Sequence, residues 1–305
     1  MLPDGLLEIG SQAFYNSGLT SVSIPGTIET VESGTFSNCL DLSSIVFNDG
    51  IKKIGGSVFL ESAVKKVHVP ASVETIETFA FYGCEKLESV TIGNGVTIIK
   101  GDAFRECYAL TSIEIPSSVT TIGGNAFLTC RALKNATIPN SVTTIEGSAF
   151  SGCSSLDNII IPTSVMSVGD RVFFGCSSLT SIEIPGSLKN IEAQMFQECR
   201  RLKSVTIKDG VTNIGYSVFA YCDSLTEIEI PNSVTSIGDC AFDFCSALES
   251  VTIGNGVEII GSWAFRKCIS LTDLTIGNNV KTIGNSAFNS CTGLTGIELP
   301  NSVTE

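Results

Sequence analysis

One sequence unit is repeated along the whole chain, and this repeat constrains the fold more than any other feature. Residues 110–130 read LTSIEIPSSVTTIGGNAFLTC, and residues 225–245 read LTEIEIPNSVTSIGDCAFDFC. One phenylalanine anchors each copy, and ten of the twelve anchor spacings are 23 residues while two are 22. The anchors are Phe14, Phe36, Phe59, Phe81, Phe104, Phe127, Phe150, Phe173, Phe196, Phe219, Phe242, Phe265 and Phe288. A fixed period of this length predicts a solenoid of stacked coils, each packing only on its neighbours.

Within one copy, the apolar pattern predicts two extended segments and a tight return. Ile113 and Ile115 flank Glu114, an alternation typical of a strand with one buried face. A proline or a Gly-Asn turn follows and ends the strand. Val119 and Ile122 predict a second extended segment, and the A-F-x-x-C motif after it predicts one short helical turn. Most of the apolar burial in a coil then needs a neighbour on both sides.

Composition limits the classes of protein to which this chain can belong. Its 305 residues are 43% hydrophobic and only 16% charged, which indicates a packed protein rather than a disordered one. The net charge of −13 argues against nucleic-acid binding, which needs clustered Lys and Arg to neutralise phosphates. No apolar run reaches the roughly 20 residues of a membrane span, and no signal peptide is visible. We therefore expect neither a nucleic-acid partner nor membrane insertion.

Eleven of the twelve cysteines share one column, three residues after the anchor. Stacked coils hold these side chains parallel, whereas a disulfide needs converging Cβ vectors and zinc needs four converging ligands. We therefore expect buried structural thiols, with some disulfides or a metal site as the alternatives. So many thiols suit a reducing cytosol or an anaerobic niche better than an oxidising one.

Cys240 is the exception, because it stands two residues before its anchor. Other copies place polar residues such as Gln12, Asp102 and Asn125 in this column. The column is expected to face solvent, so Cys240 is predicted to be an exposed and reactive thiol. The alternative is a tolerated surface substitution without a role.

The repeat resembles the leucine-rich repeat, and more narrowly the BspA-like (Treponema-type) class of surface repeats. The proline after the strand, the A-F pair and the cysteine recur together over residues 2–305. The asparagine of the general pattern L-x-x-L-x-L-x-x-N is replaced, as at Ser118 and Gly210, so its turn must be stabilised differently. The resemblance implies a repeat solenoid with a right-handed superhelix, mostly β, with a parallel concave sheet and short helical turns (nominally α/β). It also implies binding or adhesion rather than catalysis.

The domain prediction is one leucine-rich-repeat solenoid of about thirteen coils over residues 1–305. Leu2-Pro3 and Leu299-Pro300 occupy the same slot in the middle of a repeat, and neither end carries a polar cap. A solenoid needs caps over its terminal cores. We therefore expect a fragment of a longer chain, whose uncapped ends favour end-to-end self-association.

Two surfaces are candidate ligand sites. The outward residues of the concave sheet are mostly Ser and Thr, and acidic residues among them in the C-terminal half are expected to contact a basic partner surface. These acidic residues are Glu183, Glu227, Glu229, Asp273 and Glu298. The second set is aromatic and is expected to form an exposed apolar patch: Tyr216, Tyr221, Phe244 and Trp263. The alternatives are a merely solvated sheet and rings that pack locally over their own turns.

Catalysis finds little support in the sequence. The single histidine, His68, falls on a sheet face without a motif that supplies a nucleophile, and the glycines recur as turn residues rather than as a phosphate loop. We therefore expect no enzyme activity, cofactor or metal. The predicted function is a binding or adhesion module from a microbial cell-surface or secreted protein, recognising a protein or glycan ligand. The alternative is an intracellular scaffold for protein–protein interaction, located in the cytoplasm.

Overall fold

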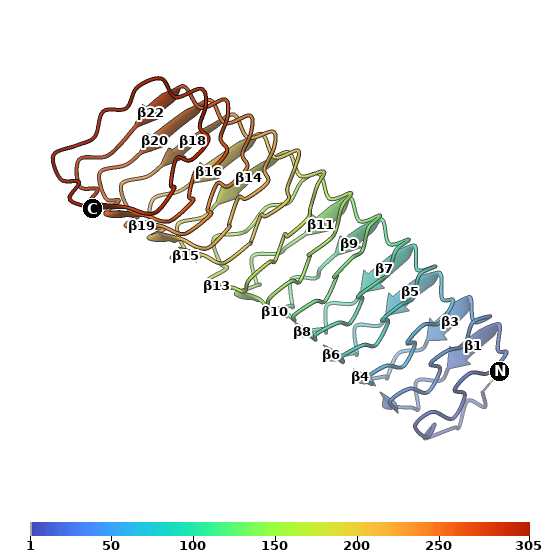
Figure 1. Ribbon diagram of the computed structural model, residues 1–305. Coiled ribbons are helices and arrows are strands. Elements are labelled where there is room, and N and C mark those ends of the chain that lie inside the picture. Colours follow the sequence, from blue (N-terminus) through green and yellow to red (C-terminus); the bar gives the residue numbers. More distant parts are fainter. Residues whose placement is uncertain (1) are drawn as a thin grey trace. The chain divides into compact units, whose positions relative to one another are not determined.

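The computed structural model describes residues 2–305 and divides into two compact units, Met1–Leu156 and Asp157–Glu305. Each unit is a parallel β-solenoid, in which successive coils stack along the chain (Figure 1). The described residues contain strands and turns but no helix. The solenoid class expected from the repeat is therefore confirmed, while the boundaries of a single domain over residues 1–305 stay a prediction.

The first unit contains twelve short strands. They are β1 (Ser21–Ile24), β2 (Thr30–Val31), β3 (Ser44–Phe47), β4 (Lys53–Ile54), β5 (Lys66–Val69), β6 (Thr75–Ile76), β7 (Ser89–Ile92), β8 (Ile98–Ile99), β9 (Ser112–Glu114), β10 (Thr121–Ile122), β11 (Asn135–Thr137) and β12 (Thr144–Ile145). The longer strands form one parallel sheet in the order β1-β3-β5-β7-β9-β11, and the two-residue strands form another in the order β2-β4-β6-β8-β10-β12. Register follows the repeat, since Val22 pairs with Ile45 and Val67 with Val90.

The second unit contains eleven strands. They are β13 (Ser167–Val168), β14 (Ser181–Ile184), β15 (Asn190–Ile191), β16 (Ser204–Ile207), β17 (Asn213–Ile214), β18 (Glu227–Ile230), β19 (Ser236–Ile237), β20 (Ser250–Ile253), β21 (Ile259–Ile260), β22 (Asp273–Thr275) and β23 (Thr282–Ile283). The short strands form the parallel sheet β15-β17-β19-β21-β23. The longer strands form two sheets, β14-β16 and β18-β20-β22, so the ladder is interrupted between β16 and β18 in the part of the chain described.

The return segment of each coil is a run of tight turns rather than the expected helical turn. Around Phe104, the N–H of Arg105 donates to the carbonyl of Asp102 within the same coil, at 3.3 Å. The N–H of Phe104 instead donates to the carbonyl of Ala126 in the next coil, at 2.8 Å. An α-helix needs each N–H to bond four residues back in its own segment. Because alternate N–H groups here serve the neighbouring coil, the segment cannot be helical.

Two positions in every coil adopt the left-handed backbone conformation, two residues before and two residues after the anchor. Their φ angles lie between 52° and 70°. Glycine occupies such a position in some coils, as at Gly34 and Gly83, but most coils place another residue there. This conformation costs a residue with a Cβ about 1–2 kcal/mol. At either position, favourable contacts of a bulky side chain must therefore offset this conformational cost.

The anchor phenylalanines and the cysteines build two ladders through the core of each unit. Rings of consecutive anchors are stacked with centroids 5.0–5.6 Å apart. In ten coils the cysteine thiol lies 3.0–3.4 Å from the carbonyl oxygen of the preceding coil's anchor, as Cys84 does with Phe59. All twelve cysteines are buried, as expected for the ladder column, and burial raises the pKa of the Cys84 thiol to about 12.

Candidate ligand-binding surfaces

Three of the four expected aromatic residues form one half-exposed cluster on the return edge of the second unit. Tyr221 and Phe244 stand two residues after the anchors of successive coils, and their rings stack with centroids 4.8 Å apart. Trp263 stands two residues before the anchor of the following coil and is 44% exposed. Tyr216 is 53% exposed, but no ring contact joins it to the other aromatic residues described.

Arg266 joins these rings into one surface. Its guanidinium carbon lies 5.3 Å from the ring centroid of Phe244 and 5.4 Å from that of Trp263, both within the range of cation–π interactions. The Lys267 ammonium lies 4.4 Å from the ring centroid of Phe244. We name Tyr221, Phe244, Trp263 and Arg266 the aromatic edge. Sequence analysis missed Arg266, although the 23-residue period places it directly beside Asp243 of the preceding coil.

A buried carboxylate holds Arg266 in place. Nε of Arg266 donates to Oδ1 of Asp243 at 2.8 Å, and Nη2 donates to Oδ2 at 2.6 Å. Asp243 is buried, with 4% of its surface exposed. This hydrogen bonding raises the pKa of Arg266, so the residue stays charged. Because the pairing is bidentate, it fixes the plane of the guanidinium against the two rings.

The prediction of an exposed thiol at Cys240 is wrong. Cys240 is 8% exposed and belongs to a column whose preceding member, Ser217, is also buried at 4%. Burial raises the pKa of the Cys240 thiol, and the nearby Asp243 carboxylate raises it further. The column is not uniformly buried, since Trp263 in the next coil is 44% exposed. At Cys240, the side chains of Ser217, Asp243 and Arg266 lie close enough to act on the thiol. Cys240 is therefore another protonated, sheltered thiol.

The aromatic edge occupies the most restricted backbone positions of the coil. Tyr221, Phe244 and Trp263 have φ angles of 62°, 59° and 56°, in the left-handed region. Positive φ in a bulky residue is an outlier that needs an explanation. Glycine stands in the equivalent place in other coils, for example at Gly34 and Gly152. The left-handed backbone conformation at these positions therefore disfavours the three aromatic residues.

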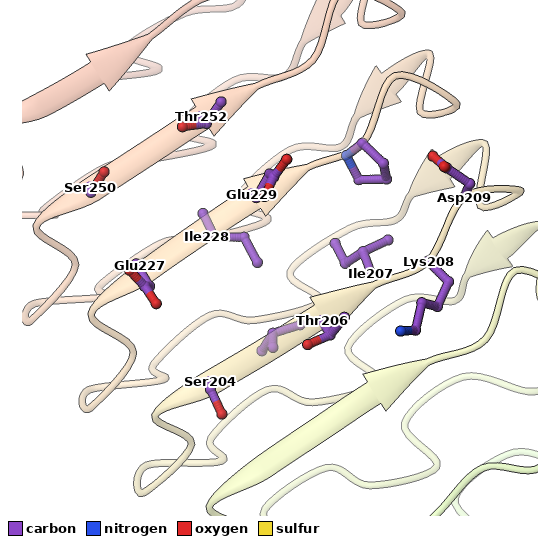
Figure 2. Close-up of a pocket in the computed structure, with 12 residues that line it drawn as sticks. Ser204, Thr206, Ile207, Lys208, Asp209, Glu227, Ile228, Glu229, Ser250 and Thr252 are labelled. Carbon is purple, nitrogen blue, oxygen red and sulfur yellow. The ribbon is translucent and has the colours of Figure 1, made fainter.

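The expected acidic surface lies on the strands rather than on the return edge. Glu227 and Glu229 project from β18, and the register places Glu227 beside Ser250 of β20, which in turn pairs with Asp273 of β22. Figure 2 shows Glu227 and Glu229 with Ser204, Thr206, Ser250 and Thr252 along the neighbouring strands. These residues line an open groove of about 540 Å³ at the interruption between β16 and β18.

Two of the expected acidic residues are set apart from this groove. The Glu183 carboxylate accepts a salt bridge from Lys208, with Nζ and Oε2 3.1 Å apart, so its charge is partly neutralised. Glu298 lies beyond the last strand and lines a separate hollow beside Asp273. The acidic surface is thus one polar groove with neighbouring acids rather than a continuous acidic face.

The first unit carries a second aromatic and cationic cluster that sequence analysis did not identify. The rings of Phe79 and Tyr82 meet edge to face at 5.8 Å, and the Arg105 guanidinium lies 5.4 Å from the Tyr82 ring centroid. Arg131 lies 5.1 Å from the ring centroid of Tyr108. Pairing each tyrosine with the residue one period later would have found both cation–π pairs, because Arg105 follows Tyr82 and Arg131 follows Tyr108 by 23 residues.

No group of three or more His, Cys, Asp or Glu side chains in residues 2–305 is arranged to hold a metal ion. No helix within that range is long and apolar enough to cross a membrane.

Comparison with known proteins identifies the repeat. The family described as the BspA type leucine rich repeat region matches residues 7–134, 120–229 and 212–305. Among curated protein sequences, no match is found.

Solved structures of bacterial leucine-rich repeat proteins are similar over nearly the whole chain. One from Bacteroides ovatus shares 28% identity with a TM-score of 0.73, over 99% of this chain and 78% of that chain. One from Eubacterium ventriosum shares 23% identity with a TM-score of 0.59, over 97% and 82%. The pneumococcal vaccine antigen PcpA shares 21% identity with a TM-score of 0.56, over 93% and 73%. The last two similarities concern the fold alone.

Proposed function

The chain belongs to the BspA-type leucine-rich repeat family, and from this premise we propose that it is a non-catalytic module that binds a protein ligand on the aromatic edge. Leucine-rich repeat families serve as protein-interaction modules and are generally non-catalytic. The extended row of coils supplies a rigid support, and the variable positions supply the contacts.

The observation that carries this proposal is the placement of large rings at left-handed backbone positions. Tyr221, Phe244 and Trp263 occupy positions that favour glycine, yet they remain partly exposed instead of being buried for stability. Aromatic residues and arginine dominate the binding energy of protein interfaces. The Asp243–Arg266 pair keeps this surface ordered before a ligand arrives, which lowers the entropy lost on binding.

The proposed cellular location is a microbial cell surface or the surroundings of the cell after secretion. Members of this repeat family are commonly bacterial surface proteins, which supports adhesion at a microbial cell surface or after secretion. Twelve buried cysteines favour the alternative, an intracellular scaffold in a reducing compartment. A signal peptide and an anchor encoded in the gene for this chain would support the first setting, and a gene without them would support the second.

Other interactions expected from the sequence remain proposals in addition to binding at the aromatic edge. The groove with Glu227 and Glu229 offers a polar, acidic surface for a basic part of the same protein ligand. A glycan is the alternative ligand, since aromatic rings also stack on sugar faces. End-to-end self-association is a further proposal, and sedimentation at several protein concentrations would detect it.

A binding screen tests the proposal. The immobilised chain is exposed to extracellular-matrix proteins, mucins and a glycan array, next to a variant with Tyr221→Ser, Phe244→Ser and Trp263→Ser. Tyr15→Ser is the matched control, because Tyr15 is 54% exposed and lies in the other unit. We expect saturable binding to a protein that the control retains and the triple variant loses. Binding that a correctly folded triple variant retains would refute the aromatic edge, and hits confined to glycans would refute the protein ligand.

A further inference from the structure

A notch opens in the return edge of the first unit where one coil is a residue shorter than its neighbours. Only Ala63 stands between Ser62 and the buried Val64, whereas both adjacent coils have two residues at this place. The neighbouring pairs are Leu40-Asp41 and Glu85-Lys86. The missing residue leaves a hollow of about 440 Å³ between these two turns.

The floor of the notch is fixed by hydrogen bonds, so the short coil does not fill the gap. The Ser62 hydroxyl donates to the carbonyl of Phe36 at 2.6 Å and accepts the N–H of Cys39 at 3.2 Å. Ser62 is 2% exposed and takes the place that a thiol has in other coils. Ala63 beside it is 7% exposed, and its N–H donates to the Cys39 carbonyl at 3.3 Å. The hollow is therefore held open by the hydrogen bonds of the short coil.

The walls of the notch combine apolar surface with unpaired acids. Leu40 is 62% exposed on one side, and Tyr82 lines the other. Glu61 and Glu85 also line the notch, and neither forms a salt bridge within residues 2–305. A third acid, Glu106, is shared with Arg105, whose Nε lies 3.2 Å from its Oε1.

The charge balance of the notch is negative. Lys86 is the one basic residue among those that line it, against the carboxylates of Glu61, Glu85 and Glu106. Burial raises the pKa of Tyr82, the carboxylates of Glu106 and Glu61 raise it further, and the Arg105 guanidinium opposes them. Because Arg105 pairs with Glu106, the carboxylates of Glu61 and Glu85 carry the excess negative charge. An occupant should therefore have an apolar body and a positive end.

We propose that this notch binds a lysine side chain of a partner protein. The alkyl stem packs against Leu40 and Ala63, and the ammonium group lies near Glu61 and Glu85, next to the Tyr82 ring. Long cationic side chains bury their stems on apolar surface while the charge stays near solvent or a counter-ion. The site is in the first unit and does not depend on the aromatic edge.

Peptide titration followed by NMR tests the notch. The probes are the capped tripeptides Gly-Lys-Gly, Gly-norleucine-Gly and Gly-Glu-Gly, and the readouts are the methyl signals of Leu40 and the ring signals of Tyr82. Glu61→Gln with Glu85→Gln removes the charge, and Glu88→Gln is the matched control because Glu88 is exposed nearby but does not line the notch. A serine inserted after Ala63 restores the full coil length and fills the gap.

We expect saturable shifts with the lysine peptide alone. Binding should weaken about fivefold in the double glutamine variant, since each exposed ion pair contributes only ~0.2–1 kcal/mol. The control should bind unchanged, and the insertion should abolish binding. Equal binding of the norleucine peptide, unchanged lysine binding in the double variant, or no shift with any peptide would each overturn the proposal. The double variant leaves the backbone intact, so the test stands even if the insertion fails to fold.

Discussion

The anchor ladder of the second unit predicts a large difference between two substitutions of the same residue type. Phe242 is fully buried and stacks on two rings, with centroids 5.2 Å from Phe219 and 5.0 Å from Phe265. Phe288 is only half-buried and stacks on one, with its centroid 5.4 Å from that of Phe265. Phe242→Ala should lower the free energy of unfolding by about 3–5 kcal/mol, as for other buried aromatic residues. Phe288→Ala should lower it by roughly 1–2 kcal/mol, because less surface and one ring contact are lost.

Urea unfolding measured by tryptophan fluorescence tests this difference. The chain has one tryptophan, Trp263, and it lies in the second unit, so the signal reports on the unit that carries both substitutions. The slope of the unfolding free energy against urea concentration should be the same in both variants. An equal slope shows that the surface exposed on unfolding has not changed. Phe242→Leu, which keeps most of the volume, should cost about 1.5 kcal/mol or less. Equal losses for Phe242→Ala and Phe288→Ala would refute the argument that coils are stabilised by neighbours on both sides.

Four further predictions concern the thiols, the left-handed positions and the buried ion pair. A thiol-exchange reagent at about pH 8 should label none of the twelve cysteines rapidly in the native protein and all of them after unfolding; rapid labelling of Cys240 would contradict its burial. The folded pKa of Cys84 is raised from 9.0 to about 12, so its contribution to stability is present below pH 9 and should be lost as pH rises to about 12. The slope is about 1.4 kcal/mol per pH unit, and Cys84→Ala should reduce the fall in urea midpoint over this window. Gly34→Ala should destabilise the first unit by about 1–2 kcal/mol because φ is +67° there, whereas Gly10→Ala should change the melting temperature little because no atom lies near its Cβ direction. Asp243→Asn should change the emission of Trp263 by loosening Arg266, and an unchanged spectrum would show that the pair does not order this surface.

The repeat period by itself determined which side chains stack. Because a coil adds 23 residues, or 22 in two cases, a residue and its counterpart one period later occupy the same place in adjacent coils, as Val22 and Ile45 do in the sheet. The anchor ladder and the buried cysteine column follow from that spacing, whereas the alternation along each strand follows from apolar residues two positions apart within each copy. The contact between Tyr221 and Phe244 was also predictable, since the two rings share a column.

Tertiary contacts determined the backbone conformation of the return segment and the burial of the side chains on it. The A-F-x-x-C motif is compatible with a helical turn, but the next coil takes alternate N–H groups, as Ala126 does for Phe104. The local sequence does not show that two carbonyl groups compete for the same N–H. The accepting carbonyl belongs to the neighbouring coil and is in place only after the two coils have packed. Burial of Cys240 has the same origin, since its shelter comes from side chains one coil away. Spacing can therefore predict which residues become neighbours, while the backbone conformation and exposure at the return edge are set by what the neighbouring coil contributes.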